Sequence, residues 1–220
     1  GSIANGIKTD TFTFFLLFFY SNIIGLKPAL AGLAIFIALC VDAITDPLMG
    51  TISDRTKSSL GRRHPYMLIS FIPMSLGYVF LFAPRQDWDM SQNDLFVWMT
   101  IFTILTRIGM TLFDIPHRAF GGEVTKNYKE RTLLMSWREM VGWVAGLSNA
   151  FLGYGIFFAS TPEYPQGQLN PDAWFPFAVT GAIFMILSVL YSSLSTKDEI
   201  KSLSKWSGSI SLIDILKEIK

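Results

Sequence analysis

Six apolar segments, each about as long as a membrane-spanning helix, constrain this sequence more than any other feature. They lie at residues 6–26, 29–52, 66–84, 95–118, 133–159 and 173–195, and the third is the shortest. A helix needs about 20 mostly apolar residues to cross the ~30 Å hydrocarbon core of a bilayer. Alternation of period two, which would favour a closed barrel, is absent from these segments. The sequence therefore predicts an all-α, polytopic membrane protein with six transmembrane helices.

The composition argues against the main soluble classes. Charged residues make up 16% of the 220 residues and hydrophobic residues make up 50%, whereas soluble domains carry about 25% charged residues. A single Cys and two His residues leave little material for a disulfide framework or a metal centre. The net charge of +1 gives no field that would steer an acidic partner. We expect a lipid bilayer as the surroundings, no cofactor, no nucleic acid and no metal beyond a monovalent cation.

The distribution of basic residues predicts how the helices are oriented. Lys and Arg gather after the second, fourth and sixth segments, whereas the opposite connections carry only Lys27 and Arg85 beside several acidic residues. Cytoplasmic loops of membrane proteins carry the excess of positive charge. We therefore expect both ends of the chain to lie in the cytoplasm.

Asp42 and Asp46 are the residues least expected in an apolar segment. An ionisable residue in the middle of a membrane helix costs about 2.5–3.5 kcal/mol on insertion scales. At positions i and i+4 the two carboxylates lie about 40° apart on one helix face, where a proton or a monovalent cation would relieve their repulsion. Thr45 and a carbonyl freed by Pro47 are further candidate ligands. The alternative is that both aspartates lie near the membrane surface in a cytoplasmic loop.

The fourth segment repeats this pattern with Arg107, Thr111 and Asp114 on one helix face. Asp114 is a candidate to pair with Arg107 or to contact a polar ligand. Thr111 would add a ligand to the aspartate pair if the second and fourth helices are adjacent. A buried Arg–Asp pair within this one helix is the alternative.

Polar and aromatic side chains in the first and fifth segments are less easily placed. Asp10 is a candidate for a cavity wall, and Lys8 either accompanies it or extends to the membrane surface. Trp137 can offer an aromatic face to a sugar ring or lie at the membrane interface.

The connection after the second segment carries the dense polar motif G-T-I-S-D-R-T-K-S-S-L-G-R-R-H-P at residues 50–65. Gly50 permits two helices to approach closely, and Asp54 is placed to pair with an Arg across a helix interface. Arg62 and Arg63 can reach helix carboxyl ends or acidic lipid. A pairing that forms in one state and breaks in another would act as a gate, while the alternative is an ordinary positively charged loop.

Four stretches resemble the glycoside–pentoside–hexuronide:cation symporters, a family of the major facilitator superfamily. They are D-A-I-T-D-P-L-M-G-T-I-S-D-R-T-K-S-S-L-G-R-R-H-P-Y (Asp42–Tyr66), F-F-Y-S-N-I-I-G-L (Phe18–Leu26), F-D-I-P-H-R-A-F-G-G-E-V-T (Phe113–Thr125) and Y-K-E-R-T (Tyr128–Thr132). The resemblance runs along essentially the whole chain.

This resemblance implies a twelve-helix carrier of the cell membrane that takes up a sugar or glycoside by alternating access, driven by Na⁺ or H⁺. Residues 1–196 would be its N-terminal six-helix bundle and residues 197–220 the start of its cytoplasmic central loop. The C-terminal six-helix half, which lies outside these residues, would then be a partner of this chain.

The resemblance also implies roles for single residues. The cation-binding residues would be Asp42, Asp46, Thr45 and Thr111. Asp114 would bind substrate, and the other candidates for substrate contact are Asp10, Arg107, Arg118 and Trp137. The cytoplasmic gating motif would comprise Gly50, Asp54, Arg55, Gly61, Arg62, Arg63 and Arg131.

The sequence departs from the family's melibiose carriers at three places. Asn5 and Gly6 align with their Lys–Asp pair on the first helix, so that Asp10 is the nearest carboxylate, and Arg118 aligns with their Trp under the sugar ring. The identity of the sugar is therefore not carried over. Thr45 stands where they have an Asn ligand, which leaves Na⁺ and H⁺ both open.

Three other functions are alternatives to cation-coupled transport of a sugar. Relatives in animals carry lysophospholipids, so a lysolipid or another non-sugar solute is the first alternative. A non-transporting receptor built on a carrier fold is the second, and the retained aspartate pair argues against it. A CDP-alcohol phosphotransferase is the third, but the spacing D-x-x-x-D-P departs from that enzyme motif.

Overall fold

The computed structural model describes residues 1–125 and 127–197, which are predominantly helical and contain no strand. In chain order the elements are α1 (Ser2–Asp10), η1 (Thr11–Phe15), α2 (Leu16–Phe18), η2 (Phe19–Ile24), α3 (Pro28–Arg55), α4 (His64–Ile69), α5 (Phe71–Leu81), η3 (Gln86–Trp88), α6 (Gln92–Val124), α7 (Tyr128–Leu152), η4 (Gly153–Phe157), η5 (Gly167–Leu169), η6 (Pro171–Ala173) and α8 (Trp174–Ser195). The expected central loop at residues 197–220 lies, apart from its first residue, outside the described part.

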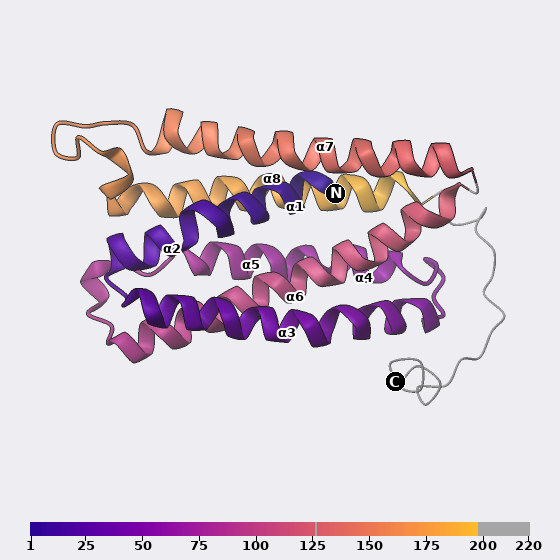
Figure 1. Cartoon of the computed structure of the whole chain (residues 1–220), viewed down its shortest axis with the longest axis horizontal. Helices are drawn as coiled ribbons and strands as arrows, with labels where there is room; N and C mark the ends of the chain where they lie inside the picture. The colour runs from indigo at the N-terminus through magenta and orange to yellow at the C-terminus, as the bar shows by residue number, and fades with distance from the viewer. Residues whose placement is uncertain (126, 198–220) are drawn as a thin grey trace.

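The long helices lie side by side along one axis of the molecule (Figure 1). α6 packs between α3 and α5, and α1 packs against α7 and α8. The contact between α5 and α8 joins these two groups. The predicted all-α membrane fold is confirmed.

Five helical stretches are long and apolar enough to cross a membrane. They are Pro28–Arg55, His64–Leu81, Gln92–Val124, Tyr128–Phe157 and Pro171–Ser195, and they correspond to the second to sixth predicted segments. The first predicted segment is also helical, from Ser2 to Ile24, but two π-helical stretches divide it. Its role as a sixth transmembrane helix remains a prediction.

α3 and α6 extend beyond the apolar windows that predicted them. Pro47 and Pro116 both lie inside these helices, and α6 continues past Pro116 to Val124. A capping box at its start, in which Ser91 and Asp94 bond each other's backbone amides, satisfies free amide groups of the first turn. The added turns carry both helices to the polar motif at residues 50–65.

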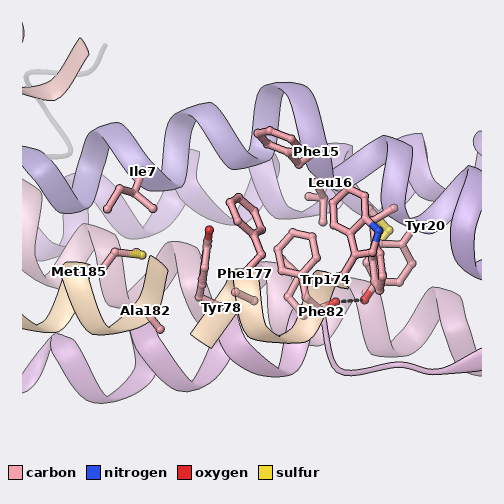
Figure 2. Close-up of a cluster of buried hydrophobic side chains, with 14 of the residues drawn as sticks. Ile7, Phe15, Leu16, Tyr20, Tyr78, Phe82, Trp174, Phe177, Ala182 and Met185 are labelled. Carbon is pink, nitrogen blue, oxygen red and sulfur yellow. Dashed lines mark hydrogen bonds between the residues drawn. The ribbon is translucent and has the colours of Figure 1, made fainter. Parts of the chain in front are cut away.

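An aromatic core fixes the first helical segment against α5 and α8 (Figure 2). Its fully buried members include Phe19, Tyr20, Tyr78, Phe82, Trp174 and Phe177. Their polar atoms are satisfied, because the hydroxyl of Tyr20 donates to the carbonyl of Leu81 at 2.8 Å and the hydroxyls of Tyr78 and Thr11 lie 2.7 Å apart. An unsatisfied polar group in an apolar interior would cost several kcal/mol.

A small residue at a helix crossing sets the position of α6. A Cβ atom added at Gly109 would lie 2.3 Å from the backbone nitrogen of Met74 in α5. Only glycine permits the two backbones to approach this closely. The crossing places the polar face of α6 opposite α3.

Candidate functional site

A polar cavity of about 260 Å³ lies among α1, α3 and α6. It is lined by Asn5, Lys8, Thr9, Asp42, Asp46, Arg107, Met110, Thr111, Asp114, Ile115 and Arg118. Three of these side chains are basic and three are acidic. Ionisable groups inside a membrane bundle are costly unless they face water, a partner or a ligand. The cavity is therefore the candidate site.

Asp42 of α3 and Arg107 of α6 form an ion pair across the cavity. Nη1 of Arg107 donates to Oδ2 of Asp42, and the two side chains are 14% and 20% exposed. The second carboxylate oxygen, Oδ1, is buried and has no hydrogen-bond partner among the described residues. This oxygen remains able to accept a proton or to ligate a cation.

Asp46, one helical turn further along α3, has a neutral partner. The Thr111 hydroxyl of α6 donates to Oδ1 of Asp46 at 2.6 Å. Within the described residues Asp46 forms no ion pair. The neighbouring Thr45 hydroxyl is buried and unpartnered there, although Thr45 does not line the cavity. Carboxylate and hydroxyl oxygens of this kind suit a hard monovalent cation or a proton.

Asp114 lies between two guanidinium groups. Nε of Arg118, one turn along α6, is 2.6 Å from Oδ2 of Asp114. Arg138 of α7 binds the other oxygen, Oδ1, and its side chain is only 7% exposed. Arg107 pairs with Asp42 of another helix, so the alternative of an Arg107–Asp114 pair within one helix is not what the structure contains.

Two candidates for substrate contact lie apart from the cavity. Asp10 is buried on α1 and lies beside Gly146 of α7. Trp137 lies on α7 and is 56% exposed. Neither residue belongs to the cavity wall, whereas Arg118, Arg107 and Asp114 do.

Sequence reasoning missed Arg138 and did not settle the place of Lys8. Arg138 was detectable, because it is an ionisable residue inside the fifth apolar segment, where the rule that singled out Asp42 and Asp46 also applies. Lys8 lines the cavity within electrostatic range of all three of its aspartates.

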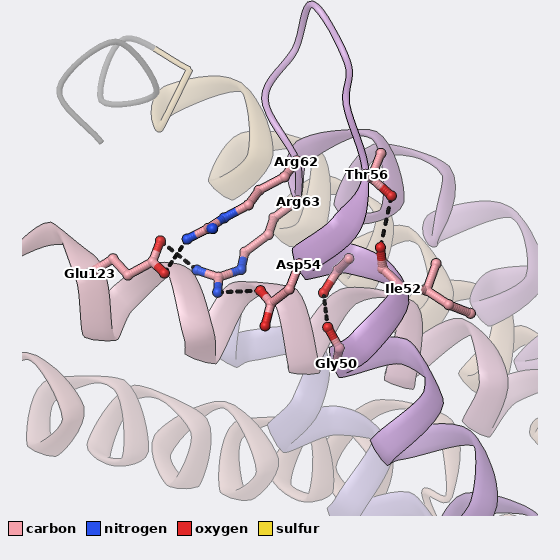
Figure 3. Close-up of polar contacts among 8 residues, drawn as sticks. Gly50, Ile52, Asp54, Thr56, Arg62, Arg63 and Glu123 are labelled. Atoms are coloured by element: carbon pink, nitrogen blue, oxygen red, sulfur yellow. Dashed lines mark hydrogen bonds and ion pairs between the residues drawn. The ribbon is translucent and has the colours of Figure 1, made fainter. Parts of the chain in front are cut away.

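The motif at residues 50–65 forms a compact ionic cluster with Glu123 at the ends of α3 and α6 (Figure 3). Arg63 contacts Asp54 at 2.6 Å and Glu123 at 2.7 Å, and Arg62 also pairs with Glu123. The Arg63 side chain is 6% exposed. Gly61, which precedes the two arginines, has a φ of +77° that favours glycine. Sequence reasoning did not identify Glu123 as the second acidic partner.

The remaining members of the motif lie at helix ends or contacts. A Cβ at Gly50 would lie 3.8 Å from Ile115, an ordinary contact, so this glycine is not required by the packing of α3 on α6. Arg55 occupies the last turn of α3. Arg131 reaches the carbonyl of Thr125 between α6 and α7.

A bundle of membrane-spanning helices around a cavity of opposed charges defines a protein of the solute-transporter class. The sequence matches the family of MFS/sugar transport proteins over residues 1–219, and the chain belongs to that family. Its members are transporters and not enzymes.

Three relatives illustrate the range of the family. An uncharacterized symporter of Synechocystis is 32% identical over 90% of this chain and 36% of its own length. A putative glycoside/cation symporter of Escherichia coli is 29% identical over 74% of this chain and 42% of its own length. A sodium-dependent lysophosphatidylcholine symporter of Danio rerio is 30% identical over 68% of this chain and 28% of its own length. The chain thus spans well under half the length of these curated relatives.

Proposed function

We propose that this chain is the N-terminal half of a secondary active transporter that couples a monovalent cation to the movement of a sugar or glycoside by alternating access. The observation that carries the proposal is the cavity in which Asp42, Asp46 and Asp114 face three basic side chains. The glycoside/cation relative supports the same pairing of solute and ion.

The cation would bind at Asp46. Its carboxylate accepts a neutral hydrogen bond from Thr111, and the buried unpartnered oxygens of Asp42 and Thr45 lie on the same stretch of α3. Binding of Na⁺ or H⁺ there would remove the negative charge that Asp46 holds without an ionic partner. Symport requires that cation and solute raise each other's affinity, typically by 1–3 kcal/mol.

The solute would bind at the Asp114 end of the cavity. A carboxylate between two arginines accepts hydrogen bonds from solute hydroxyls, while the guanidinium groups donate to solute oxygens. Arg118 is 51% exposed and is the more accessible of these two donors. Arg107 and the more distant Asp10 and Trp137 remain candidates for contact.

The remainder of the carrier would cover the open side of this bundle. α7 and η4 expose many large apolar side chains: Leu133, Trp137, Met140, Trp143, Val144, Leu147, Phe151 and Tyr154. A C-terminal half packed near α7 and α1 would close the cavity and allow the two halves to rock about a midplane site. The ionic cluster around Arg63 would then act as the cytoplasmic gate. The carrier would lie in the cell membrane or inner membrane, and both ends of this segment would lie in the cytoplasm.

A lysolipid is the second candidate solute, favoured by the relative from Danio rerio. A lysolipid carries an acyl chain, and an apolar groove of about 340 Å³ lies between α1, α7 and α8. It is lined mainly by aliphatic side chains such as Ile7, Met140, Val144 and Leu152.

The test uses the complete polypeptide in proteoliposomes. Uptake of labelled glycosides, pentoses, uronides and lysophosphatidylcholine is measured under an imposed Na⁺ gradient and then under an H⁺ gradient. Ion-driven accumulation that is lost in Asp46→Asn and kept in the control Asp87→Asn, a change in an exposed loop, supports the proposal. Accumulation of lysophosphatidylcholine alone would replace the sugar, and ion-driven accumulation that persists in Asp46→Asn would refute the assigned cation site.

A further inference from the structure

Arg107 brings a permanent positive charge to one of the two carboxylates of the proposed cation site. It comes from α6, whereas both carboxylates belong to α3, and its ion pair with Asp42 is largely buried. A guanidinium group stays protonated under all conditions that a protein meets. Asp42 is therefore already neutralised by a group of the protein itself.

The guanidinium group of Arg107 does not have all of its hydrogen-bond donors satisfied. Its Nε atom is buried and has no hydrogen-bond partner among the described residues. The ring of Phe12 lies beside it, with its centroid 5.6 Å from the guanidinium carbon. An Arg held at one end by a single carboxylate, with an unsatisfied donor, is placed to move when that carboxylate gains another partner.

The free oxygen of Asp42 makes such a partner possible. Oδ1 is buried and unpartnered, while Oδ2 binds Arg107. A cation at Oδ1 would lie close to the guanidinium, and two like charges on one carboxylate repel each other strongly in a partly desolvated site. The charges that face this pair are Lys8 from α1, Asp46 from α3, and Asp114 and Arg118 from α6.

The formal charges of the two aspartates and Arg107 are consistent with competition between Arg107 and one cation. Asp42, Asp46 and Arg107 together carry one formal negative charge, which a single monovalent cation balances. Without Arg107 the same two aspartates would carry two negative charges and would attract a cation more strongly.

We propose that Arg107 is a tethered counter-ion that competes with the coupling cation for Asp42 and so lowers the affinity of the site for that cation. This inference rests on the proposed function of Asp42 and Asp46. It makes Arg107 a positioning and specificity residue for ion coupling, separate from any contact with the solute.

The test measures Na⁺ binding to the complete purified polypeptide by isothermal titration calorimetry. Arg107→Gln removes the charge, Arg107→Lys keeps it, and Arg85→Gln is a matched change in an exposed loop, where Arg85 is 61% exposed. We expect Arg107→Gln to bind Na⁺ about tenfold more tightly or better, and the other two variants to stay within about twofold of the unmodified protein. Equal affinity in Arg107→Gln and the unmodified protein would overturn the proposal.

A double variant covers the case in which Arg107→Gln does not fold, because that change leaves Asp42 without its partner. Asp42→Asn with Arg107→Gln removes both charges and keeps the net charge of the site. We expect its Na⁺ affinity to lie within about threefold of the unmodified protein, since carboxylate and competitor are lost together. Complete loss of binding would show that Asp42 holds the cation while paired with Arg107, and the proposal would be wrong.

The same variants serve if Na⁺ gives no heat and the coupling ion is H⁺. Ion-driven uptake is then measured against external pH, and Arg107→Gln should shift the half-maximal pH upward by about one unit, a tenfold gain in proton affinity. An unshifted profile would overturn the inference. Asp46→Asn separates the two proposals. If Asp46→Asn loses ion dependence and Arg107→Gln has no effect, only the role of Arg107 is refuted. If ion-driven uptake is unchanged in Asp46→Asn, the proposed function is refuted.

Discussion

Arg138 of α7 binds Asp114 of α6, and the two side chains are only 7% and 14% exposed. This ion pair joins the helix that bears the cavity to a helix outside its wall. α6 and α7 otherwise share few close contacts, because each packs mainly against other helices. The solute end of the proposed site therefore depends on a contact between two helices that are adjacent in sequence but only loosely packed.

Removing Arg138 should destabilise the bundle. Arg138→Gln leaves Asp114 with Arg118 alone, and breaking a buried pair from one side typically costs about 3–5 kcal/mol. We expect a clearly lower melting temperature in detergent, measured by fluorescence-detected size-exclusion chromatography. Asp114→Asn combined with Arg138→Gln should recover much of that loss, because no charge is then left unpaired. A double variant no more stable than Arg138→Gln would contradict this account.

Thr111 should act on the cation through its hydroxyl alone. Thr111→Val keeps the shape of the side chain but removes the hydrogen bond to Asp46, which is 2.6 Å long. Hydrogen bonds to charged groups contribute about 1.5–3 kcal/mol, so the cation concentration for half-maximal uptake should change about tenfold or more. Thr111→Ser, which retains the hydroxyl, is the control. If both variants behave like the unmodified protein, the hydroxyl has no part in ion coupling.

Arg63 should be the member of the ionic cluster at the ends of α3 and α6 that tolerates change least. It is nearly buried and contacts both Asp54 and Glu123 through different nitrogen atoms. A planar guanidinium presents its donors in a rigid fork, whereas an ammonium group offers a single nitrogen on a flexible stem. We expect Arg63→Lys to lower the melting temperature by several degrees and Arg62→Lys, whose side chain is 20% exposed, to have a smaller effect. Equal losses would show that the two arginines carry the cluster together.

The crossing of α5 and α6 should not accept a side chain at Gly109. A Cβ there would lie 2.3 Å from the backbone nitrogen of Met74, whereas a Cβ at Gly122 of the same helix would meet nothing within 4 Å. Gly109→Ala should therefore reduce the yield of folded protein severely. Gly122→Ala should be neutral or stabilise the helix by up to about 1 kcal/mol. The yield and melting temperature of the two variants in detergent provide the comparison, and a well-folded Gly109→Ala protein would contradict the packing described above.

The helical segments were predictable because the thickness of a bilayer fixes the length of an apolar span. The ends of the helices were less accessible to sequence reasoning. α6 begins before its apolar window and passes through Pro116 to Val124, because a capping box and the ionic cluster at Glu123 stabilise turns that hydropathy alone does not mark. Helical periodicity also placed Asp42 with Asp46, and Thr111 with Asp114, on shared helix faces.

The sequence by itself determined that costly charges would gather on the inner faces of two apolar helices, since periodicity is a property of one helix at a time. Only the tertiary structure decided the partners of these charges. Arg107 binds Asp42 of α3 and leaves Asp114 to Arg118 and Arg138, while Asp10 lies towards α7. The physical reason is that an ion pair depends on which helices are neighbours and on their rotation, and these follow from close packing at residues such as Gly109.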